Sequence, residues 1–188
     1  RQVLMFSATI PNNILKLSSK YLNKPIRISV GNSNIVAKNI KQEIIELKSD
    51  EKLDQLIQQI DNRNGSILIF VKTKYGTEKL SKALSKKKIK SFPLHGGLRQ
   101  SKRNTIMKNF RDMKFRILIA TDVAARGIDV PHIEHVINYD LPQMAEDFIH
   151  RIGRTARAGS KGIALSFVTK GDFAKWKEIQ KILNPEKN

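Results

Sequence analysis

Short apolar segments alternate with helical patterns along most of this chain of 188 residues. The apolar segments are bounded by turn residues and predict strands at 3–6, 26–30, 67–71, 91–94, 117–120, 135–138 and 163–168. Apolar residues at helical spacing predict helices at 52–60, 76–84, 102–110 and 173–183. Because neighbouring parallel strands need a crossover connection, the alternation predicts the α/β class, with a mostly parallel sheet and helices on both faces.

The polar stretch 31–39, GNSNIVAKN, has no periodic pattern and predicts a linker. Residues 1–30 before it supply one strand, one helix and one strand, which are too few to bury a core. We therefore expect 1–30 to be the remnant of another domain and 40–188 to form a complete domain. The chain begins with Arg1 rather than methionine, so we expect it to be a piece of a longer protein.

The chain is strongly basic, with 35 Lys and Arg against 17 Asp and Glu and a formal net charge of +18. Such a charge repels itself and favours a polyanionic partner, nucleic acid first, although lysines that only fill solvated faces would give the same count. Aromatic residues make up only 6%, so contact with the sugar-phosphate backbone is favoured over base stacking. The absence of cysteine predicts a cytoplasmic protein. No apolar run is long enough to span a bilayer, so no membrane partner is expected.

The segment 150–159, HRIGRTARAG, places Arg151, Arg154 and Arg157 at successive spacings of three. On a helix these arginines would share one face, where like charges repel unless an anion lies in front of them. A phosphate fits that requirement. A solvated basic helix face is the alternative. The glycines at 153 and 159 argue against it, because glycine destabilises a helix and a solvated face gains nothing in return.

Polar residues crowd the end of the predicted strand 117–120. Thr121 and Asp122 follow it directly, and Arg126, Gly127 and Asp129 come next. A hydroxyl can donate to phosphate, a glycine lets backbone approach a ligand, and a carboxylate can accept from ribose hydroxyls. Asp122 as a helix cap and Arg126 in an internal ion pair are equally compatible with the sequence.

Two other predicted strands end in the same way. Thr73 follows the strand at 67–71 and Gly97 follows the strand at 91–94, while Gln100 and Arg103 begin a helix, where backbone amides favour phosphate. Each signal is weak alone, because such residues are common in turns. The four histidines lack metal-ligand spacing, so no metal site is expected.

Taken together, six segments resemble the ordered motifs of DEAD-box ATP-dependent RNA helicases, and some details resemble the bacterial RhlE-like subgroup. They are FSAT (6–9), FVKT (70–73), LHGGLRQSKR (94–103), ATDVAARGIDV (120–130), INYDLP (137–142) and HRIGRTARAG (150–159). The resemblance implies a RecA-like C-terminal lobe that binds RNA. It also implies ATP and Mg²⁺, both held mainly by an N-terminal lobe that would be this lobe's partner.

The resemblance also assigns roles to single residues. Arg154 and Arg157 match arginines that reach the γ-phosphate across the cleft between the lobes, and His150 and Arg151 match positions that couple lobes and nucleotide. The matched nucleotide contacts are Gly127 and Asp129. The matched positions on or supporting the RNA surface are Thr73, Gly97, Gln100, Arg103 and Thr121. The matched positions linking ATP hydrolysis to unwinding are Ser7 and Thr9.

Two departures from the family pattern stand out. Ala156 replaces a glycine found in many members, which restricts the loop backbone but removes no charge. The chain contains neither a G-x-x-x-x-G-K-[ST] phosphate loop nor an Asp-Glu-Ala-Asp motif, so we expect that alone it does not hydrolyse ATP. A non-catalytic RNA-binding or interaction module and half of a related DNA-dependent motor remain as alternatives.

Overall fold

A computed structural model describes residues 2–6, 12–28 and 39–183 of the chain. The chain divides into two compact units, Arg1–Asn32 and Ser33–Asn188. In the described part of both units, no helix combines the length and apolar character needed to cross a bilayer.

The described residues of the first unit form one helix, α1 (Asn12–Ser18). The predicted strands at 3–6 and 26–30 are wrong for residues 3–6 and 26–28, which are not in strands, and 29–30 lie outside the described residues. Phe6 and Ile26 are 87% and 88% exposed. A strand gains its hydrogen bonds from a neighbouring strand, and no described residue offers these segments one.

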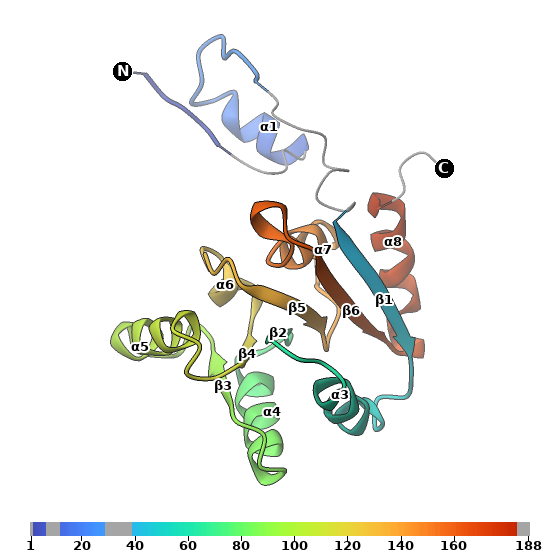
Figure 1. Ribbon diagram of the computed structural model, residues 1–188. Coiled ribbons are helices and arrows are strands. Elements are labelled where there is room, and N and C mark those ends of the chain that lie inside the picture. Colours follow the sequence, from blue (N-terminus) through green and yellow to red (C-terminus); the bar gives the residue numbers. More distant parts are fainter. Residues whose placement is uncertain (1, 7–11, 29–38, 184–188) are drawn as a thin grey trace. The chain divides into compact units, whose positions relative to one another are not determined.

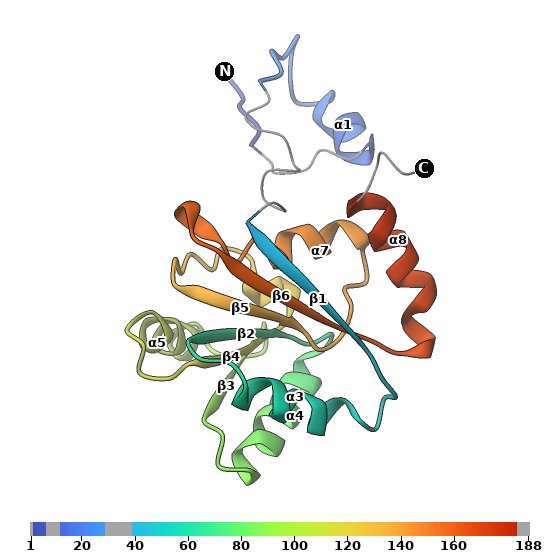
Figure 2. The same ribbon diagram turned by 45° about the vertical axis from the view of Figure 1, so that its right-hand side comes forward.

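The second unit is built on a six-stranded sheet in the order β1-β6-β5-β2-β4-β3 (Figures 1 and 2). All five strand pairs are parallel, which confirms the predicted sheet. The strands are β1 (Ile40–Glu46), β2 (Ser66–Phe70), β3 (Ser91–Leu94), β4 (Ile117–Ala120), β5 (Ile133–Asn138) and β6 (Gly162–Val168).

Helices cover both faces of the sheet, as the sequence predicts (Figure 1). The α-helices are α3 (Lys52–Asp61), α4 (Lys74–Lys86), α5 (Gln100–Arg111), α6 (Asp122–Ala125), α7 (Ala145–Ile152) and α8 (Phe173–Leu183). Two short 3-10 helices are η1 (Arg157–Gly159) and η2 (Lys170–Asp172).

Alternation along β2 shows how the two faces are filled. Ile67 and Ile69 point into the cluster formed with α3 and α4, whereas Leu68 and Phe70 point into the cluster formed with α5 and α6. All four side chains are at most 1% exposed. Because β2 is buried on both faces, all of its core positions are apolar, and this is why an unbroken apolar run appears in the sequence.

The sequence did not predict β1. Its sequence, IKQEIIE, is half polar, and only Ile40 is fully buried. β1 is an edge strand that pairs with β6 alone, with Ile40 opposite Gly162. An edge strand tolerates polar side chains because one side of it faces no further strand, so its pattern is weak in the sequence.

Candidate functional site

Three neighbouring strands end together at one edge of the sheet, here called the carboxyl edge. Leu94 and Phe70 lie on either side of Ala120 in the register of β3, β4 and β2. Thr121 directly follows β4, and its amide donates to the carbonyl of Leu94 at 3.3 Å. Thr73 comes three residues after the end of β2, which brings it to the same edge.

Local hydrogen bonds fix the turns that carry Thr73 and Gly97. The Thr73 hydroxyl accepts from the amide of Gly76 at 2.9 Å and so caps α4. Gly97 donates its amide to Nδ1 of His95 at 3.1 Å. Because Nδ1 accepts, Nε2 carries the proton and donates to Glu78 Oε1 at 2.9 Å. The exposed backbone of Gly97 is thereby held in place.

Gln100 and Arg103 occupy the first turn of α5, which begins just beyond the end of β3. Gln100 is exposed, and its Nε2 donates to Asn104 Oδ1 at 2.9 Å. Arg103 is partly buried and forms no ion pair with any described residue. The structure therefore brings all five residues predicted for RNA contact to the carboxyl edge and the start of its adjoining helix.

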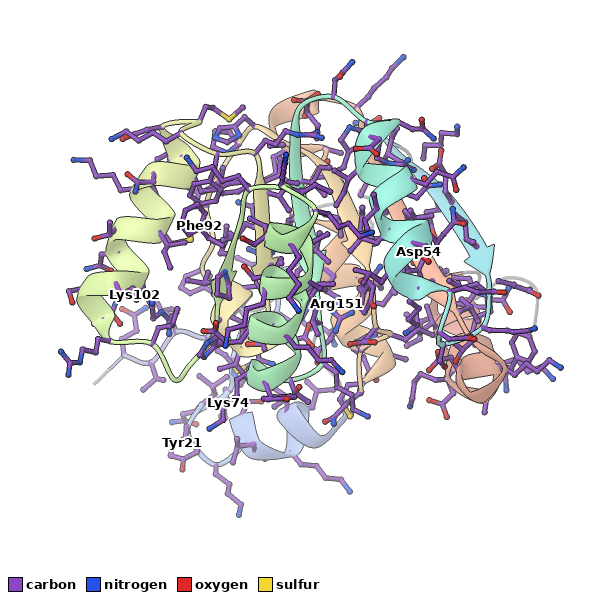
Figure 3. All side chains as sticks on the ribbon, turned by 90° about the horizontal axis from the view of Figure 1, so that it is seen from below. Tyr21, Asp54, Lys74, Phe92, Lys102 and Arg151 are labelled. Carbon is purple, nitrogen blue, oxygen red and sulfur yellow. The ribbon has the colours of Figure 1, made fainter. Side chains whose placement is uncertain are left out.

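Arg151, labelled in Figure 3, occupies the interior of the same edge and is 1% exposed. Its Nε and Nη2 donate to the two carboxylate oxygens of Asp122 at 2.5 and 2.8 Å. Its Nη1 donates to Asn138 Oδ1 at 3.1 Å and to the carbonyl of Asp140 at 2.6 Å, and the guanidinium lies 4.8 Å from the ring centre of Phe70. Arg151 therefore joins α6, β5 and α7 and is not placed to touch a phosphate.

The Asp140 side chain extends this network toward β2 and α3. Its Oδ1 accepts from Lys52 Nζ at 3.0 Å, and its Oδ2 accepts from the amide of Lys72 at 3.1 Å. Lys52 Nζ also donates to the Tyr139 carbonyl at 2.8 Å. Burial, reinforced by the Asp140 charge, raises the pKa of Tyr139 to about 12.

Sequence reasoning assigned no role to Lys52 or Asp140. Lys52 stands at the start of an amphipathic helix, where a solvated lysine is ordinary. Asp140 lies in INYDLP, a segment that the sequence analysis used for recognition only. The one available signal was a carboxylate two residues after a buried strand, at the edge where such sheets collect polar groups.

Arg151, Arg154 and Arg157 do not stand on one helix, so the shared face that a helix would give them is not formed. α7 ends at Ile152, and Ala156 has a left-handed backbone with φ of 56°, so the segment turns before η1 begins. The reason lies in Thr155, whose buried hydroxyl donates to the carbonyl of Ile133 at 2.6 Å and anchors the turn at the start of β5.

Arg154 and Arg157 lie together in this turn. Arg154 donates to the carbonyls of His150 and Ile128 at 3.1 and 3.0 Å, and no described carboxylate forms a salt bridge with it. Burial, then the neighbouring charge of Arg157, lowers the pKa of Arg154, and Asp129 opposes this in part. The site therefore holds two adjacent cations that a bound anion would stabilise.

Asp129 and Gly127 complete this group. Asp129 Oδ1 accepts from Arg157 Nη1 at 2.7 Å, and its side chain is 89% exposed. Gly127 has a φ of +78°, where a side chain would be strained, and no atom lies within 4 Å of the position a Cβ would take. An accessible carboxylate and an open stretch of backbone thus lie beside two arginines, an arrangement that fits a ribose and a phosphate.

His150 lines a small cavity of about 40 Å³ between α6 and α7. Its Nδ1 lies 3.8 Å from Asp147 Oδ1, and the exposed Arg126 reaches the same carboxylate oxygen at 3.6 Å. Arg126 thus has the internal partner that the sequence left open, whereas Asp122 pairs with Arg151 instead of capping α6 through its side chain.

Two predicted positions, Ser7 and Thr9, lie outside the described residues. No group of three or more His, Cys, Asp or Glu able to hold a metal exists in the described ranges. The observed groups in this lobe fit a phosphate and a ribose.

Replacing Ala156 by glycine is expected to stabilise the domain by about 0.5–1 kcal/mol, because alanine is disfavoured at the φ of 56° that it adopts. The gain is partly offset by the greater freedom of glycine in the unfolded chain. Urea unfolding measures the change. Ala83→Gly, within α4, is the control and should destabilise by about the same amount; equal losses in both variants would contradict the left-handed assignment.

The parallel sheet, its strand order and its covering helices define a RecA-like lobe of the helicase type. The family described as "Helicase conserved C-terminal domain" matches residues 48–159, and the chain belongs to this family.

Similar proteins cover nearly the whole chain. The ATP-dependent RNA helicase FAL1 of Saccharomyces cerevisiae is 41% identical over 182 residues, which are 96% of this chain and 46% of that protein. The DEAD-box ATP-dependent RNA helicase CshA of Bacillus anthracis is 38% identical over 181 residues, 96% of this chain and 34% of that protein. The chain therefore spans half or less of the length of these relatives.

Solved structures show the same likeness. Dbp5 of S. cerevisiae bound to RNA and ADP BeF3 superposes with a TM-score of 0.86 at 34% identity, covering 95% of this chain and 48% of that one. The structure of the C-terminal domain of Dbp5 alone gives a TM-score of 0.73 at 37% identity, covering 79% of this chain and 88% of that one. These likenesses confirm the predicted fold and the predicted resemblance to DEAD-box helicases.

Proposed function

We propose that this chain is the second lobe of an ATP-dependent RNA helicase, which binds the RNA backbone at its carboxyl edge and supplies arginines to ATP held by a first lobe. The relatives named for ATP-dependent RNA helicase activity are about twice as long or more. Their activity is therefore assigned here to a longer protein that contains this chain.

The arrangement of Arg154 and Arg157 is the observation that carries this proposal. Among the described residues, Arg154 is bonded only to carbonyls, and Arg157 has a single carboxylate partner, which is itself exposed. When a γ-phosphate is transferred to water, negative charge spreads over its oxygens, and preorganised guanidinium groups stabilise that charge. Arg154 and Arg157 are the residues that would do so, with Asp129 accepting from the ribose.

Arg151 takes a positioning role in this proposal. Its bonds to Asp122 and to Asp140 tie the segment before Arg154 to the residue after Thr121. The proposed RNA contact Thr121 and the proposed phosphate contact Arg154 are each close in sequence to a member of this ion pair. His150, beside the cavity, is proposed to act with Arg151 in linking nucleotide to lobe closure.

The deciding experiment measures ATP hydrolysis with and without single-stranded RNA, on the isolated chain and on a longer protein extended through a phosphate-binding loop upstream. We expect no hydrolysis by the chain alone and RNA-stimulated hydrolysis by the longer protein. Stimulation by DNA equal to that by RNA would favour a DNA-dependent motor. RNA binding by the chain, together with a longer protein that never hydrolyses ATP, would favour a non-catalytic RNA-binding module.

A further inference from the structure

The positive charge of this protein is concentrated in one segment. Residues 72–116, from the end of β2 to the start of β4, contain fifteen Lys and Arg against two Asp and Glu. The net charge of this segment is +13 out of +18 for the whole chain. Only part of it lies at the carboxyl edge, where the proposed RNA contacts are.

Seven of these fifteen cations gather at the opposite edge of the sheet, where β3 and β4 begin. Ser91 pairs with Ile117 at these two strand starts. The turn after α4 leads into β3, and the turn after α5 leads into β4, so the cations of both turns come together there. We name this set the amino-edge basic surface: Lys86, Lys87, Lys88, Lys90, Lys108, Arg111 and Lys114.

All seven side chains of the amino-edge basic surface are exposed, and none forms an ion pair with another described residue. α4 and α5 flank β3 on opposite faces, and side chains with nitrogen tips project outward around both helices (Figure 3). Seven unpaired like charges at one edge repel each other, and a polyanion would relieve that repulsion.

We propose that the amino-edge basic surface is a second RNA-binding surface, which extends the path of the RNA backbone beyond the carboxyl edge. This inference rests on the proposed function, because it takes RNA as the partner. Two helices provide the continuity: α4 runs from Thr73 and Lys74 to Lys86, and α5 runs from Gln100 and Arg103 to Arg111. Both therefore carry basic residues from one edge to the other.

The distance between the two edges sets the length of RNA needed. α4 has 13 residues, so it spans about 20 Å, which corresponds to roughly six stacked nucleotides at about 3.4 Å each. An RNA of six nucleotides that is bound at the carboxyl edge has no nucleotides left to cross this distance, whereas one of twenty has enough to reach both edges. Because few aromatic residues are available to stack bases, the second surface would bind phosphates without sequence preference.

Lys88 occupies a backbone position that is unfavourable for lysine. It has a left-handed backbone with φ of 61°, just after α4, where glycine or asparagine is preferred. Lysines that only prevent β3 from pairing with another chain would also be exposed here. The two explanations differ in what they predict for RNA binding.

The test compares the affinity of the 188-residue chain for uridine oligonucleotides of six and twenty nucleotides across a salt series. The variant combines Lys87→Gln, Lys88→Gln, Lys90→Gln and Lys114→Gln. We expect its affinity for the 20-mer to fall about 10- to 100-fold near 0.1 M salt, and the slope of log affinity against log salt to shrink by about 3. Affinity for the 6-mer should change less than about twofold, because the 6-mer does not reach the changed residues.

A matched control removes the same charge elsewhere through Lys161→Gln, Lys170→Gln, Lys177→Gln and Lys181→Gln, at four exposed lysines near β6, η2 and α8. This control should bind both RNAs nearly as the wild type does. The single variant Lys88→Gly separates binding from folding, because it should weaken 20-mer binding while relieving backbone strain and raising the midpoint of urea unfolding.

Several outcomes would overturn the inference. Unchanged 20-mer binding by the amino-edge variant, equal losses for the 6-mer and the 20-mer, or an equal loss in the control would each do so. If the wild type binds both RNAs and the variant matches it, only this inference fails, and a protein partner or protection of the β3 edge becomes the explanation. If the wild type binds neither RNA, the RNA part of the proposed function fails as well.

Discussion

Replacing Arg157 by alanine in the longer protein is expected to lower RNA-stimulated ATP turnover about 10³- to 10⁵-fold, the contribution that arginines reaching into a phosphoryl-transfer site make. The lobe should remain folded, because the one carboxylate that Arg157 binds, Asp129, is 89% exposed and such surface pairs contribute little stability. The measurements are kcat at saturating RNA and the midpoint of urea unfolding.

Arg126→Ala is the matched control for Arg157→Ala. Arg126 is also an arginine with an acidic partner, Asp147, and its side chain is 71% exposed. It lies outside the Arg154 and Arg157 turn, so turnover should fall less than about tenfold. Wild-type turnover in Arg157→Ala, or equal losses in the two variants, would refute the proposed contact with ATP.

Replacing Asp122 by alanine is expected to destabilise the domain by about 3–5 kcal/mol, because it leaves the buried guanidinium of Arg151 without a counter-charge. Arg151 is 1% exposed, and Asn138 and the Asp140 carbonyl would be its only remaining hydrogen-bond partners among the described residues. In a domain of this size the thermal midpoint should fall by roughly 10 °C. Urea unfolding and thermal unfolding measure the two quantities.

Asp129→Ala provides the comparison for Asp122→Ala, because Asp129 is also an aspartate bound to an arginine. Its carboxylate lies in solvent rather than beside a buried cation, so the loss should be under about 1 kcal/mol. If Asp122→Ala and Asp129→Ala lower the free energy of unfolding by similar amounts, burial does not strengthen the ion pair between Asp122 and Arg151. The proposed structural role of that pair would then be refuted.

The alternation of apolar runs and amphipathic patterns was enough to predict the α/β class, the parallel sheet and the positions of most helices. The central strand β2 is buried on both faces and is evident as an unbroken run. β1 was missed because polar residues at its exposed positions interrupt the apolar run that would indicate a strand. The strands expected at 3–6 and at 26–28 did not form because a propensity does not supply the neighbouring strand that pairing needs.

The site was predicted unevenly for a related reason. Thr73, Gly97 and Thr121 reach one edge because parallel strands place their ends together, which a sequence pattern is able to indicate. Arg151 is buried within the domain, whereas Arg154 and Arg157 lie in the turn that follows α7. This difference depends on where α7 ends and on the hydrogen bond that anchors Thr155. Spacing of three residues carries no information about either. The domain limits, the roles of the site residues and the cytoplasmic location stay predictions.

Arg151 is held by four hydrogen bonds to α6, to the last residue of β5 and to the segment just after β5, and this has a mechanical consequence. Because these bonds link α7 to α6, the two segments resist displacement relative to each other. A movement of the turn that carries Arg154 would therefore move Thr121 with it. In the proposed helicase this lobe would therefore move as a rigid body. ATP hydrolysis would then act on the RNA by changing the angle between the two lobes.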